Sequence, residues 1–448
     1  MLVCPLDYRY GREEMKSVLS KENKTQKLLE VEAALARAHA EVGNIPQRAA
    51  DIISENATTE KVDWQEVERV EKEETKHDIM ALVKVLGRYC GDAEKYIHLG
   101  ATSNDIIDTG AALQLKEALK IIADDLRNLR KTMGTRAKEH KSTVMIGRTH
   151  GQHAVPMTFG LKLAAYTSEI DRHIERLKEI EKRVTVGKMS GAVGTGAALG
   201  EKAKKIQELV MDDLELGTEN ASGQIIGRDR YAELVSLAAN ISASLEKFAT
   251  EVRNLQRPEI MEVAEAFDTE KQVGSSTMAH KKNPILAENI SGLARTLRGF
   301  VGPTYENIVL WHERDLSNSS SERITIPHVL ILLDDILVKT EKLFNNLEVF
   351  PENMKKNIKM SKGLVMAEAV MMYLYSKGMS RQEAHEIIRE TAMIARAEDR
   401  PLKEVLLERS DIREFTSESE LEDVFDPESY IGRSEEIVDE IVGGEGSN

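Results

Sequence analysis

Long stretches of the chain repeat apolar residues every three or four positions. Between 228 and 257 the series is Tyr231, Leu234, Ala238, Ile241, Leu245, Phe248, Val252 and Leu255. The same spacing recurs from Leu115 to Met133 and from Leu163 to Val184, where His173 takes one of the apolar positions. This spacing places the apolar side chains on one face of an α-helix. Three long amphipathic helices are therefore predicted, and each needs partners for its apolar face.

Two further helices are predicted from local signals. Asn283 followed by Pro284 is typical of an N-cap and a first helical residue, and the helix would continue through "ILAENISGLARTLRGF". Another helix is predicted from about Pro327 to Leu347. Alternation with a period of two residues is scarce, and only 4% of the residues are aromatic. The predicted fold class is therefore all-α.

The predicted helices suggest three helical domains. The long ones fall between about 101 and 345, which predicts a central domain built as an elongated bundle of long helices. Residues 1–100 would form an N-terminal helical domain, and residues 346–448 a C-terminal one that follows the segment "FPENMKKNI". Because a single layer of such helices cannot cover its own apolar stripe, an oligomer is expected.

Charge and composition exclude several classes of protein. The formal charge of −15 argues against a general binder of nucleic acids or anionic membranes, so an anionic ligand would need a local cluster of Arg and Lys. Cys4 and Cys90 are too few for a disulfide framework and lack metal-site spacing. With no run of 18 apolar residues and no signal-peptide pattern, a soluble cytoplasmic protein is expected.

The segment "GSSTMAHKKNP" at 274–284 interrupts the helical pattern. Its small residues allow the backbone to approach a ligand, and Ser275 and Ser276 supply hydroxyl groups. Lys281 and Asn283 could hold a carboxylate beside a helix N-terminus. A solvated surface turn would have the same composition, so both interpretations stay open.

The segment "GRTHGQHAVPMTFG" places Thr149 and His150 in a glycine-flanked turn. A histidine in such a turn is well placed to act as a general acid or base. His150 and His153 are three residues apart and could ligate a metal, but no third ligand lies nearby in the sequence, so zinc is not expected. Packing alone would also account for His153.

Two more segments carry candidate polar groups before helices. "KHD" provides His77 and Asp78, which a buried, hydrogen-bonded position would also explain. "IHLGATSNDIIDTG" provides His98, Thr102 and Ser103, together with acidic residues that a simple helix N-cap would also need.

An arginine-rich and hydroxyl-rich run, "WHERDLSNSSSERITIPH", lies between predicted helices. Arg314, Ser319 and Arg323 could clamp a phosphate or carboxylate, because guanidinium groups bind such oxygens with two hydrogen bonds. A solvated loop would look similar. Weaker candidates are Gln224, Arg228 and Arg230 in "SGQIIGRDRYAE", and Arg9 with Tyr10 near the start.

The order "GATSNDIIDT", "GRTHGQHAVPMTFG", "GSSTMAHKKNP" resembles the three signature segments of the fumarase/aspartase superfamily of lyases. "KHD", the Arg9–Tyr10 pair, "QIIGRDR" and "ERDLSNSSSER" resemble the branch that releases fumarate from succinylated purine nucleotides, and the resemblance covers nearly the whole chain. It implies a homotetramer whose sites are built from loops of three subunits. It implies no cofactor and no metal.

The resemblance also implies residue roles. Ser275 matches the base that takes the proton from the succinyl Cβ, His150 the acid for the departing nitrogen, and His77 a second histidine close to the substrate. The implied substrate-binding residues are Lys281, Asn283, Thr102 and Ser103 for the succinyl group, and Arg9, Tyr10, Arg314, Ser319 and Arg323 for the phosphate side. Gln224, Asp78, His98 and Thr149 are further substrate-binding residues.

A serine hydroxyl can act as a base only where its alkoxide is stabilised, which backbone N–H groups and the Lys281 ammonium could do in a closed site. We expect the loop to be mobile without ligand so that a nucleotide can enter. Ala279 stands where this family usually has proline, which is expected to loosen the loop by less than about 1 kcal/mol.

Two alternatives remain at this stage. Another fumarate-releasing lyase of the superfamily, such as argininosuccinate lyase, would share the signatures but need no phosphate clamp. A helical scaffold protein would show no turnover, and Ser275→Ala or His150→Ala would change only its stability.

Overall fold

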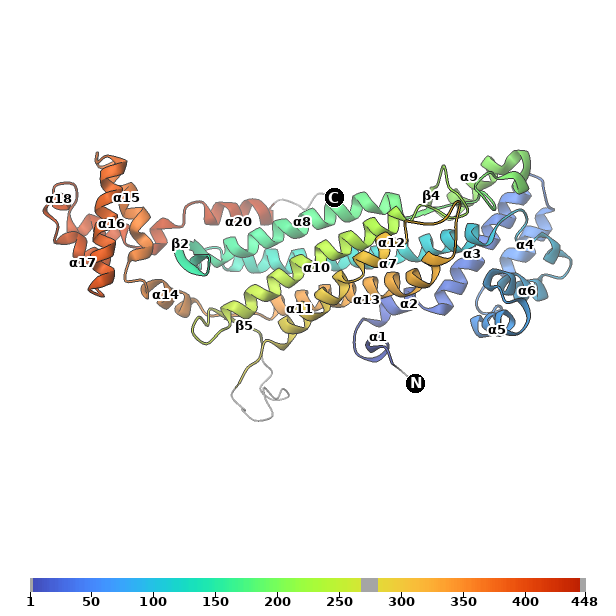
Figure 1. Ribbon diagram of the computed structural model, residues 1–448, viewed down its shortest axis with the longest axis horizontal. Coiled ribbons are helices and arrows are strands. Elements are labelled where there is room, and N and C mark those ends of the chain that lie inside the picture. Colours follow the sequence, from blue (N-terminus) through green and yellow to red (C-terminus); the bar gives the residue numbers. More distant parts are fainter. Residues whose placement is uncertain (1–2, 267–280, 444–448) are drawn as a thin grey trace. The chain divides into compact units, whose positions relative to one another are not determined.

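The computed structural model describes residues 3–266 and 281–443 and is dominated by α-helices (Figure 1). This confirms the predicted fold class. The chain divides into two compact units. Unit 1 comprises Met1–Arg127, His173–Leu245 and Gly292–Val338, and unit 2 comprises Asn128–Arg172, Glu246–Ser291 and Lys339–Asn448. The predicted division into three domains remains a prediction.

Five long helices contribute residues to both units, and they include the predicted amphipathic helices. They are α7 (Ser103–Glu139), α8 (Phe159–Val184), α10 (Asp229–Leu255), α11 (Ile285–Arg298) and α13 (Ser317–Asn345). Within unit 1, the buried His173 of α8 hydrogen-bonds to Ser244 of α10 at 2.8 Å. Within unit 2, Tyr166 of α8 stacks on Phe248 of α10 with ring centroids 4.3 Å apart. The apolar seams predicted from the sequence therefore pack helix against helix.

The predicted start of α13 near Pro327 is wrong, because the helix begins ten residues earlier at Ser317. Asp315 caps this end by accepting hydrogen bonds from the Ser317 N–H at 2.7 Å and from its hydroxyl. Asn318 donates to Glu322 one turn later, at 2.9 Å. Pro327 lies inside the helix and lacks one backbone donor. The run "SNSSSER" is therefore helical, and the predicted loop ends at Leu316.

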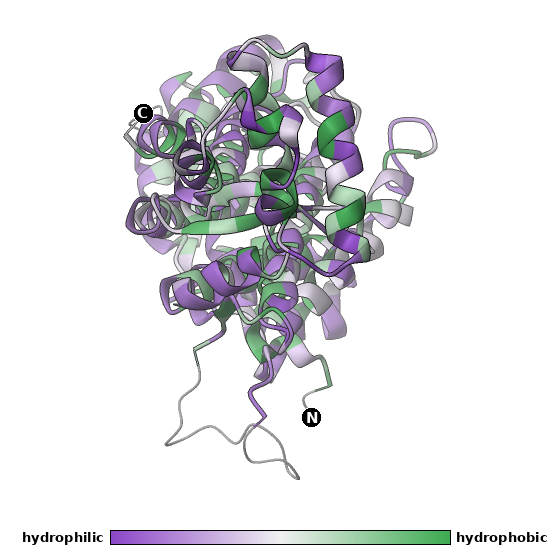
Figure 2. Cartoon of the chain, turned by 90° about the vertical axis from the view of Figure 1, so that its left-hand side faces the viewer, coloured by the Kyte–Doolittle hydropathy of each residue, from purple (hydrophilic) through white to green (hydrophobic). Residues whose placement is uncertain are grey.

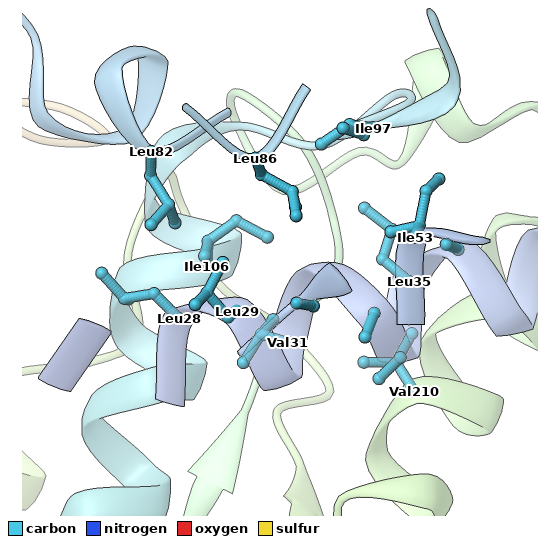
Figure 3. Packing of buried hydrophobic residues seen from close by; sticks show 14 of the residues in the cluster. Leu28, Leu29, Val31, Leu35, Ile53, Leu82, Leu86, Ile97, Ile106 and Val210 are labelled. Carbon is cyan, nitrogen blue, oxygen red and sulfur yellow. The ribbon is translucent and has the colours of Figure 1, made fainter. Parts of the chain in front are cut away.

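The other elements of unit 1 include several that contribute residues to one apolar core. They are α1 (Pro5–Tyr8), α2 (Glu13–Val18), α3 (Lys21–Glu41), α4 (Gln47–Asn56), α5 (Trp64–Val70), a π-helix (Glu71–Thr75), α6 (Asp78–Cys90), 3₁₀ turns (Gly91–Tyr96, Ala197–Lys202), α9 (Ala203–Asp213), α12 (Val301–Glu306) and the parallel strands β3 (Val186–Gly187) and β4 (Gly217–Thr218). Leu35, Ile53, Leu86 and Ile106 of this core pack together in Figure 3. Because Ile106 belongs to α7, the core fixes the start of that helix.

The other elements of unit 2 are short strands, helices and 3₁₀ turns. They are β1 (Val144–Thr149), β2 (Gln152–Thr158), β5 (Val263–Ala264), β6 (Glu348–Val349), α14 (Pro351–Lys359), 3₁₀ turns (Leu364–Met366, Pro427–Tyr430), α15 (Ala367–Ser376), α16 (Arg381–Ala397), α17 (Leu402–Leu407), α18 (Ser410–Arg413), α19 (Glu418–Val424) and α20 (Ser434–Gly443). Val370, Leu374, Ile388 and Leu406 form a buried cluster. Polar and apolar residues alternate along the helices in Figure 2, as expected of amphipathic helices.

Across residues 3–266 and 281–443, every helix is either too short or too polar to cross a lipid bilayer.

Candidate active site

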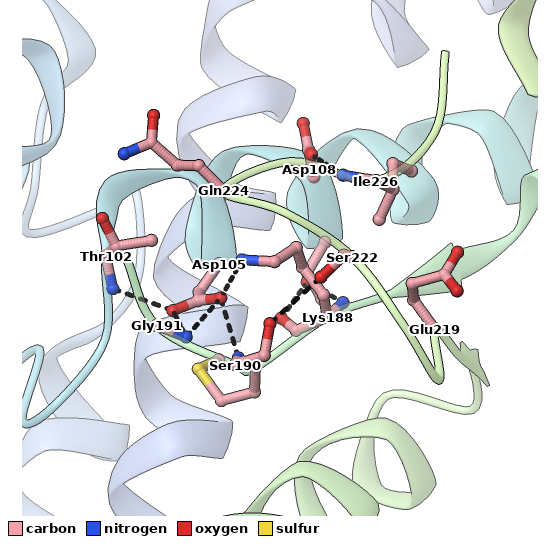
Figure 4. A network of polar contacts seen from close by, with 12 residues as sticks. Thr102, Asp105, Asp108, Lys188, Ser190, Gly191, Glu219, Ser222, Gln224 and Ile226 are labelled. Carbon is pink, nitrogen blue, oxygen red and sulfur yellow. Dashed lines mark hydrogen bonds and ion pairs between the residues drawn. The ribbon is translucent and has the colours of Figure 1, made fainter. Parts of the chain in front are cut away.

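A buried ion pair organises the start of α7. Asp105, at the third position of the helix, pairs with the ammonium group of Lys188, and both side chains are fully buried. The Asp105 carboxylate also accepts hydrogen bonds from the N–H groups of Thr102 at 2.8 Å, Ser190 at 3.0 Å and Gly191 at 3.0 Å (Figure 4). One carboxylate therefore fixes both the "GATS" segment and the segment after β3.

His77 and Ser103, both predicted as site residues, are brought together. The Nε2 atom of His77 lies 3.3 Å from the Ser103 hydroxyl. The other ring nitrogen accepts a hydrogen bond from the Met80 N–H at 3.5 Å, so His77 caps α6. That bond favours the tautomer in which Nε2 carries the proton. Asp78 follows directly in the first turn of α6, and its carboxylate lies 3.4 Å from His77 Nδ1.

Arg228 joins three segments that carry predicted site residues. Its guanidinium group donates two hydrogen bonds of 3.0 Å to Asp108 of α7 and one of 2.9 Å to Glu322 of α13. Asp108 also accepts from the Ile226 N–H at 2.9 Å. Ser319 and Arg323 lie on the same helix as Glu322, and Gln224 precedes Ile226 by two residues. The buried Arg228 therefore holds these segments in register.

Gln224 and Arg314 are also brought together. The Arg314 guanidinium donates to the Gln224 side-chain oxygen at 3.2 Å. The backbone N–H of Gln224 donates to the carbonyl of Glu313 at 3.3 Å. Arg323 lies further along α13, where Lys24 of α3 interacts electrostatically with both Arg323 and Asp78. Two of the predicted anion-binding residues, Arg314 and Arg323, therefore have other polar groups of the predicted site or a second cation as neighbours.

Arg9 and Tyr10 lie between α1 and α2. The Arg9 guanidinium stands 5.8 Å from the centre of the Tyr10 ring. The following residues anchor the segment: the Gly11 N–H donates to Asp335 at 3.1 Å, and Arg12 donates to Asp334 at 3.1 Å and to Asp125 at 2.7 Å. These bonds fix the backbone that presents Arg9 and Tyr10.

Gly11→Ala is expected to destabilise the fold by about 1–3 kcal/mol, because Gly11 has φ +84° and an added Cβ would stand 2.3 Å from Cγ2 of Ile331. Urea unfolding at fixed protein concentration measures this change. Gly43→Ala is the matched control, since Gly43 has φ +78° and no atom within 4 Å of the added Cβ. Equal losses for the two variants would contradict the steric explanation.

The stability of unit 1 should depend on pH through Asp125. Burial, together with the neighbouring Asp334 carboxylate and against the attraction of Arg12, raises the pKa of Asp125 to about 7. The folded state thus binds a proton that the unfolded state has released above about pH 4. This contribution to stability falls as pH rises from about 4 to 7. The difference in unfolding free energy between wild type and Asp125→Asn should follow that slope, and a constant difference would contradict it.

His98 stands just before the "GATS" segment, with a left-handed backbone at φ +62°. Its Nδ1 atom lies 2.7 Å from the carboxylate of Glu32, on α3. Non-glycine residues in this backbone region are uncommon and are often found at functional sites.

His150 and Thr149 lie at the tip of the hairpin formed by β1 and β2 in unit 2. His150 and Gly151 have φ of +53° and +73°, which confirms the predicted glycine-flanked turn. Below the tip, Arg148 donates two hydrogen bonds, of 2.8 and 2.7 Å, to the fully buried Glu262. The hairpin that carries His150 is therefore anchored to Glu262, and the His150 side chain is exposed. Among the described residues no three side chains of His, Cys, Asp or Glu group as a metal site.

Lys281 and Asn283 precede α11 in unit 2, and Ser275 and Ala279 lie outside the described residues. The Gln256 side chain accepts from the Glu265 N–H at 2.9 Å and donates to the Lys282 carbonyl at 3.2 Å. Glu265 caps α11 by accepting from the N–H groups of Leu286 and Ala287. Gln256 thus joins the chain before and after the segment that contains Ser275. The expectation of a mobile loop also falls outside the described residues.

Sequence reasoning missed the residues that support the site. Lys188 was not singled out, although a lysine among small and apolar residues in "TVGKMSGAVG" is a signal, since lysine is buried almost only when paired. The sequence leaves open whether Asp105 is part of a simple N-cap or a functional group, and it marks Arg228 only as a weak binding candidate. Their partners are 83 and 120 residues away in sequence, so spacing alone does not reveal them.

Comparisons with known proteins agree with this architecture. A family model described as "Lyase" matches residues 8–299, and one described as "Adenylosuccinate lyase C-terminus" matches residues 363–441. A solved fumarate lyase from Mesorhizobium has a TM-score of 0.89 and 34% identity, covering 97% of this chain and 98% of that one. A 3-carboxy-cis,cis-muconate lactonizing enzyme from Pseudomonas putida has a TM-score of 0.87 and 32% identity, covering 98% of each chain. These findings define a lyase of the fumarase/aspartase superfamily.

Curated relatives narrow the assignment. Adenylosuccinate lyase of Pyrococcus abyssi is 54% identical over 444 residues, which are 99% of this chain and 98% of the relative. Adenylosuccinate lyase of Aquifex aeolicus is 43% identical over 439 residues, 98% of this chain and 99% of the relative. The chain belongs to the adenylosuccinate lyase family. The resemblance noted in the sequence is thereby confirmed.

Proposed function

We propose that this chain catalyses β-elimination of fumarate from adenylosuccinate, giving AMP, and from the succinylated aminoimidazole carboxamide ribotide, giving the free carboxamide. The observation that carries the proposal is a set of contacts in unit 1. Thr102 donates to the buried Asp105, Ser103 lies beside His77, and Gln224 accepts from Arg314, while the buried Arg228 holds the neighbouring segments. This arrangement offers hydroxyl, imidazole, amide and guanidinium groups to an anionic substrate, which suits a succinylated nucleotide.

The reaction breaks one C–H and one C–N bond of the succinyl group. Ser275, as alkoxide, takes the proton from the succinyl Cβ, and the resulting carbanion is stabilised by the neighbouring carboxylate, which Lys281 and Asn283 hold. The electron pair forms the C=C bond of fumarate as the C–N bond breaks. His150 gives its proton to the departing nitrogen, and His77 lies close to the substrate beside Ser103. No cofactor or metal is needed for these steps.

The phosphate end of the substrate is assigned to arginine and hydroxyl groups. Arg9, Tyr10, Arg314, Ser319 and Arg323 would bind the phosphate side of the substrate, and Asp78, His98 and Thr149 are further substrate-binding residues. Thr102 and Ser103 would contact the succinyl group, and Gln224 is a further substrate contact. These roles are supported by the position of Arg314 beside Gln224 and by the helical placement of Ser319 and Arg323.

The working form is proposed to be a cytoplasmic homotetramer whose sites combine loops of three subunits. An exposed apolar surface next to Arg314 supports the assembly, since such patches mark protein contacts. Trp311 and Val309 are 77% and 74% exposed in the single chain, and Tyr305, Ile308, Leu316 and Ile324 are also exposed. Light scattering after gel filtration tests it: a mass of four chains is expected, and a monomer at working concentration would contradict it.

A substrate panel tests the activity. The purified protein is mixed with adenylosuccinate, the succinylated ribotide or argininosuccinate, and fumarate is followed by its ultraviolet absorbance. Turnover of the first two substrates is expected. Fumarate from argininosuccinate alone would favour another lyase of the superfamily, and no turnover of any substrate would favour a scaffold.

Arg323→Ala is expected to raise KM for adenylosuccinate roughly tenfold to hundredfold, because a hydrogen bond to a charged group contributes about 1.5–3 kcal/mol. The kcat value should change less, since the phosphate is remote from the reacting bonds. Arg295→Ala, which removes an arginine of α11 instead, is the control variant for this change in KM. An unchanged KM for Arg323→Ala would remove Arg323 from the phosphate contacts.

A further inference from the structure

The ring of His98 is held by a carboxylate inside the N-terminal core. Glu32 lies on α3 among the core residues and is 0% exposed, whereas the His98 side chain is 14% exposed. The two are joined by a short contact of 2.7 Å between His98 Nδ1 and Glu32 Oε1. The second oxygen of Glu32 is buried and accepts no hydrogen bond from any residue within 3–266 or 281–443. A buried carboxylate in this position needs a charged partner, and His98 supplies it.

The chain around His98 is fixed as well. The Nε2 atom of His39, on α3, lies 2.9 Å from the Leu99 carbonyl oxygen. The Nδ1 atom of the same ring accepts a hydrogen bond from the Asn44 side-chain amide at 3.0 Å. These two bonds define a neutral His39 that donates from Nε2. Together with the contact between His98 Nδ1 and Glu32, they fix the chain and the ring on either side of the left-handed His98 backbone.

We propose that Glu32 is a positioning residue of the active site, whose carboxylate orients His98 through Nδ1 and keeps its imidazole cationic, so that Nε2–H binds an anionic oxygen of the substrate. The inference rests on the proposed function, because it needs a substrate that carries carboxylates and a phosphate. It adds Glu32, which lies in the core and matches none of the sequence motifs.

The charges that face His98 support a cationic ring. Burial alone disfavours the charged imidazole, but the hydrogen bond and charge of Glu32, with a further contribution from Asp105, raise the pKa of His98 above its usual value. Asp105 belongs to α7, and its own charge is matched by Lys188. Glu32 from α3 is therefore the carboxylate available to His98. A group with a raised folded-state pKa is charged below that pKa and loses its charge as pH rises through it.

Glu32→Gln keeps the size of the side chain and removes its charge. The pKa of His98, followed by NMR of the imidazole in the full-length protein, is expected to fall, because the Glu32 charge that raises it is removed. The alkaline decline of kcat/KM for adenylosuccinate should move to lower pH by the same amount. Glu30→Gln on the same helix is the matched control, since Glu30 pairs with Lys27 near the surface.

A double variant and two ligands separate the possible outcomes of this test. In His98→Gln the additional Glu32→Gln change should leave the pH profile unaltered, and thermal melting shows whether each variant folds. Binding of AMP and of fumarate at high pH then separates the phosphate from the succinyl carboxylates, since Glu32→Gln should weaken only the ligand that His98 contacts. An unchanged His98 pKa, or unchanged affinity for both ligands, would overturn the proposal. Absence of wild-type turnover would instead overturn the proposed function and leave the NMR test of the pair intact.

Discussion

Ser275→Ala is expected to lower kcat by about 10²–10⁴-fold while leaving KM for adenylosuccinate within a few-fold of its wild-type value. General base catalysis contributes factors of this size, and the substrate keeps its binding contacts when the base alone is removed. Steady-state kinetics with adenylosuccinate measures both constants.

The neighbouring serine provides the comparison for this prediction. Ser276→Ala changes the same kind of side chain one residue later, and its loss of kcat should be far smaller. Neither substitution touches the residues before and after this segment that Gln256 joins, Glu265 and Lys282. A Ser275→Ala protein that keeps more than about one tenth of kcat would contradict the role of Ser275 as base.

Asp105→Asn is expected to destabilise the protein by about 3–5 kcal/mol and to impair catalysis. Removing one partner of a buried ion pair leaves the other charge without compensation, and the Lys188 ammonium is fully buried. The Thr102, Ser190 and Gly191 N–H groups would also bind a weaker acceptor. The "GATS" segment would then lose its fixed position, so KM should rise. Urea unfolding at fixed protein concentration and steady-state kinetics measure the two effects.

A double-mutant cycle isolates the pair. Lys188→Met in the Asp105→Asn background removes the unpaired ammonium, so the double variant should be more stable than the sum of the single losses predicts. Asp124→Asn on the same helix is the control. Its ion pair with Arg127 is exposed and is expected to contribute at most about 0.5 kcal/mol to stability. Strict additivity of the two buried substitutions would contradict the ion-pair explanation.

The long helices were predictable because their apolar residues are spaced regularly over many turns. The seam from Tyr231 to Leu255 corresponds to α10, and His173 fills a seam position as a buried hydrogen-bonding residue. The start of α13 was not predictable in this way, since Pro327 looks like a first helical residue. In the structure the helix begins at Ser317, where Asp315 accepts a hydrogen bond from the Ser317 N–H, and it continues through Pro327.

The polar motifs predict the site residues, while the residues that support them are seen only in the fold. Ser103 and His77 stand in recognisable segments, and the structure joins them at 3.3 Å. Lys188, Arg228 and Glu32 act through partners far away in sequence, so their partners cannot be read from local patterns, and no pattern marks Glu32 at all. The neighbouring folds include a lactonizing enzyme at 32% identity, which shows that this architecture carries more than one chemistry. The assignment to a substrate therefore depends on the individual side chains.

The most direct test of the account is a paired progress curve: fumarate released from adenylosuccinate by the wild-type protein and by Ser275→Ala at equal concentration. Complete conversion to fumarate and AMP is expected for the wild type, and a rate lower by at least about 10²-fold for the variant. Equal rates for the two proteins, or no fumarate from the wild type, would contradict it.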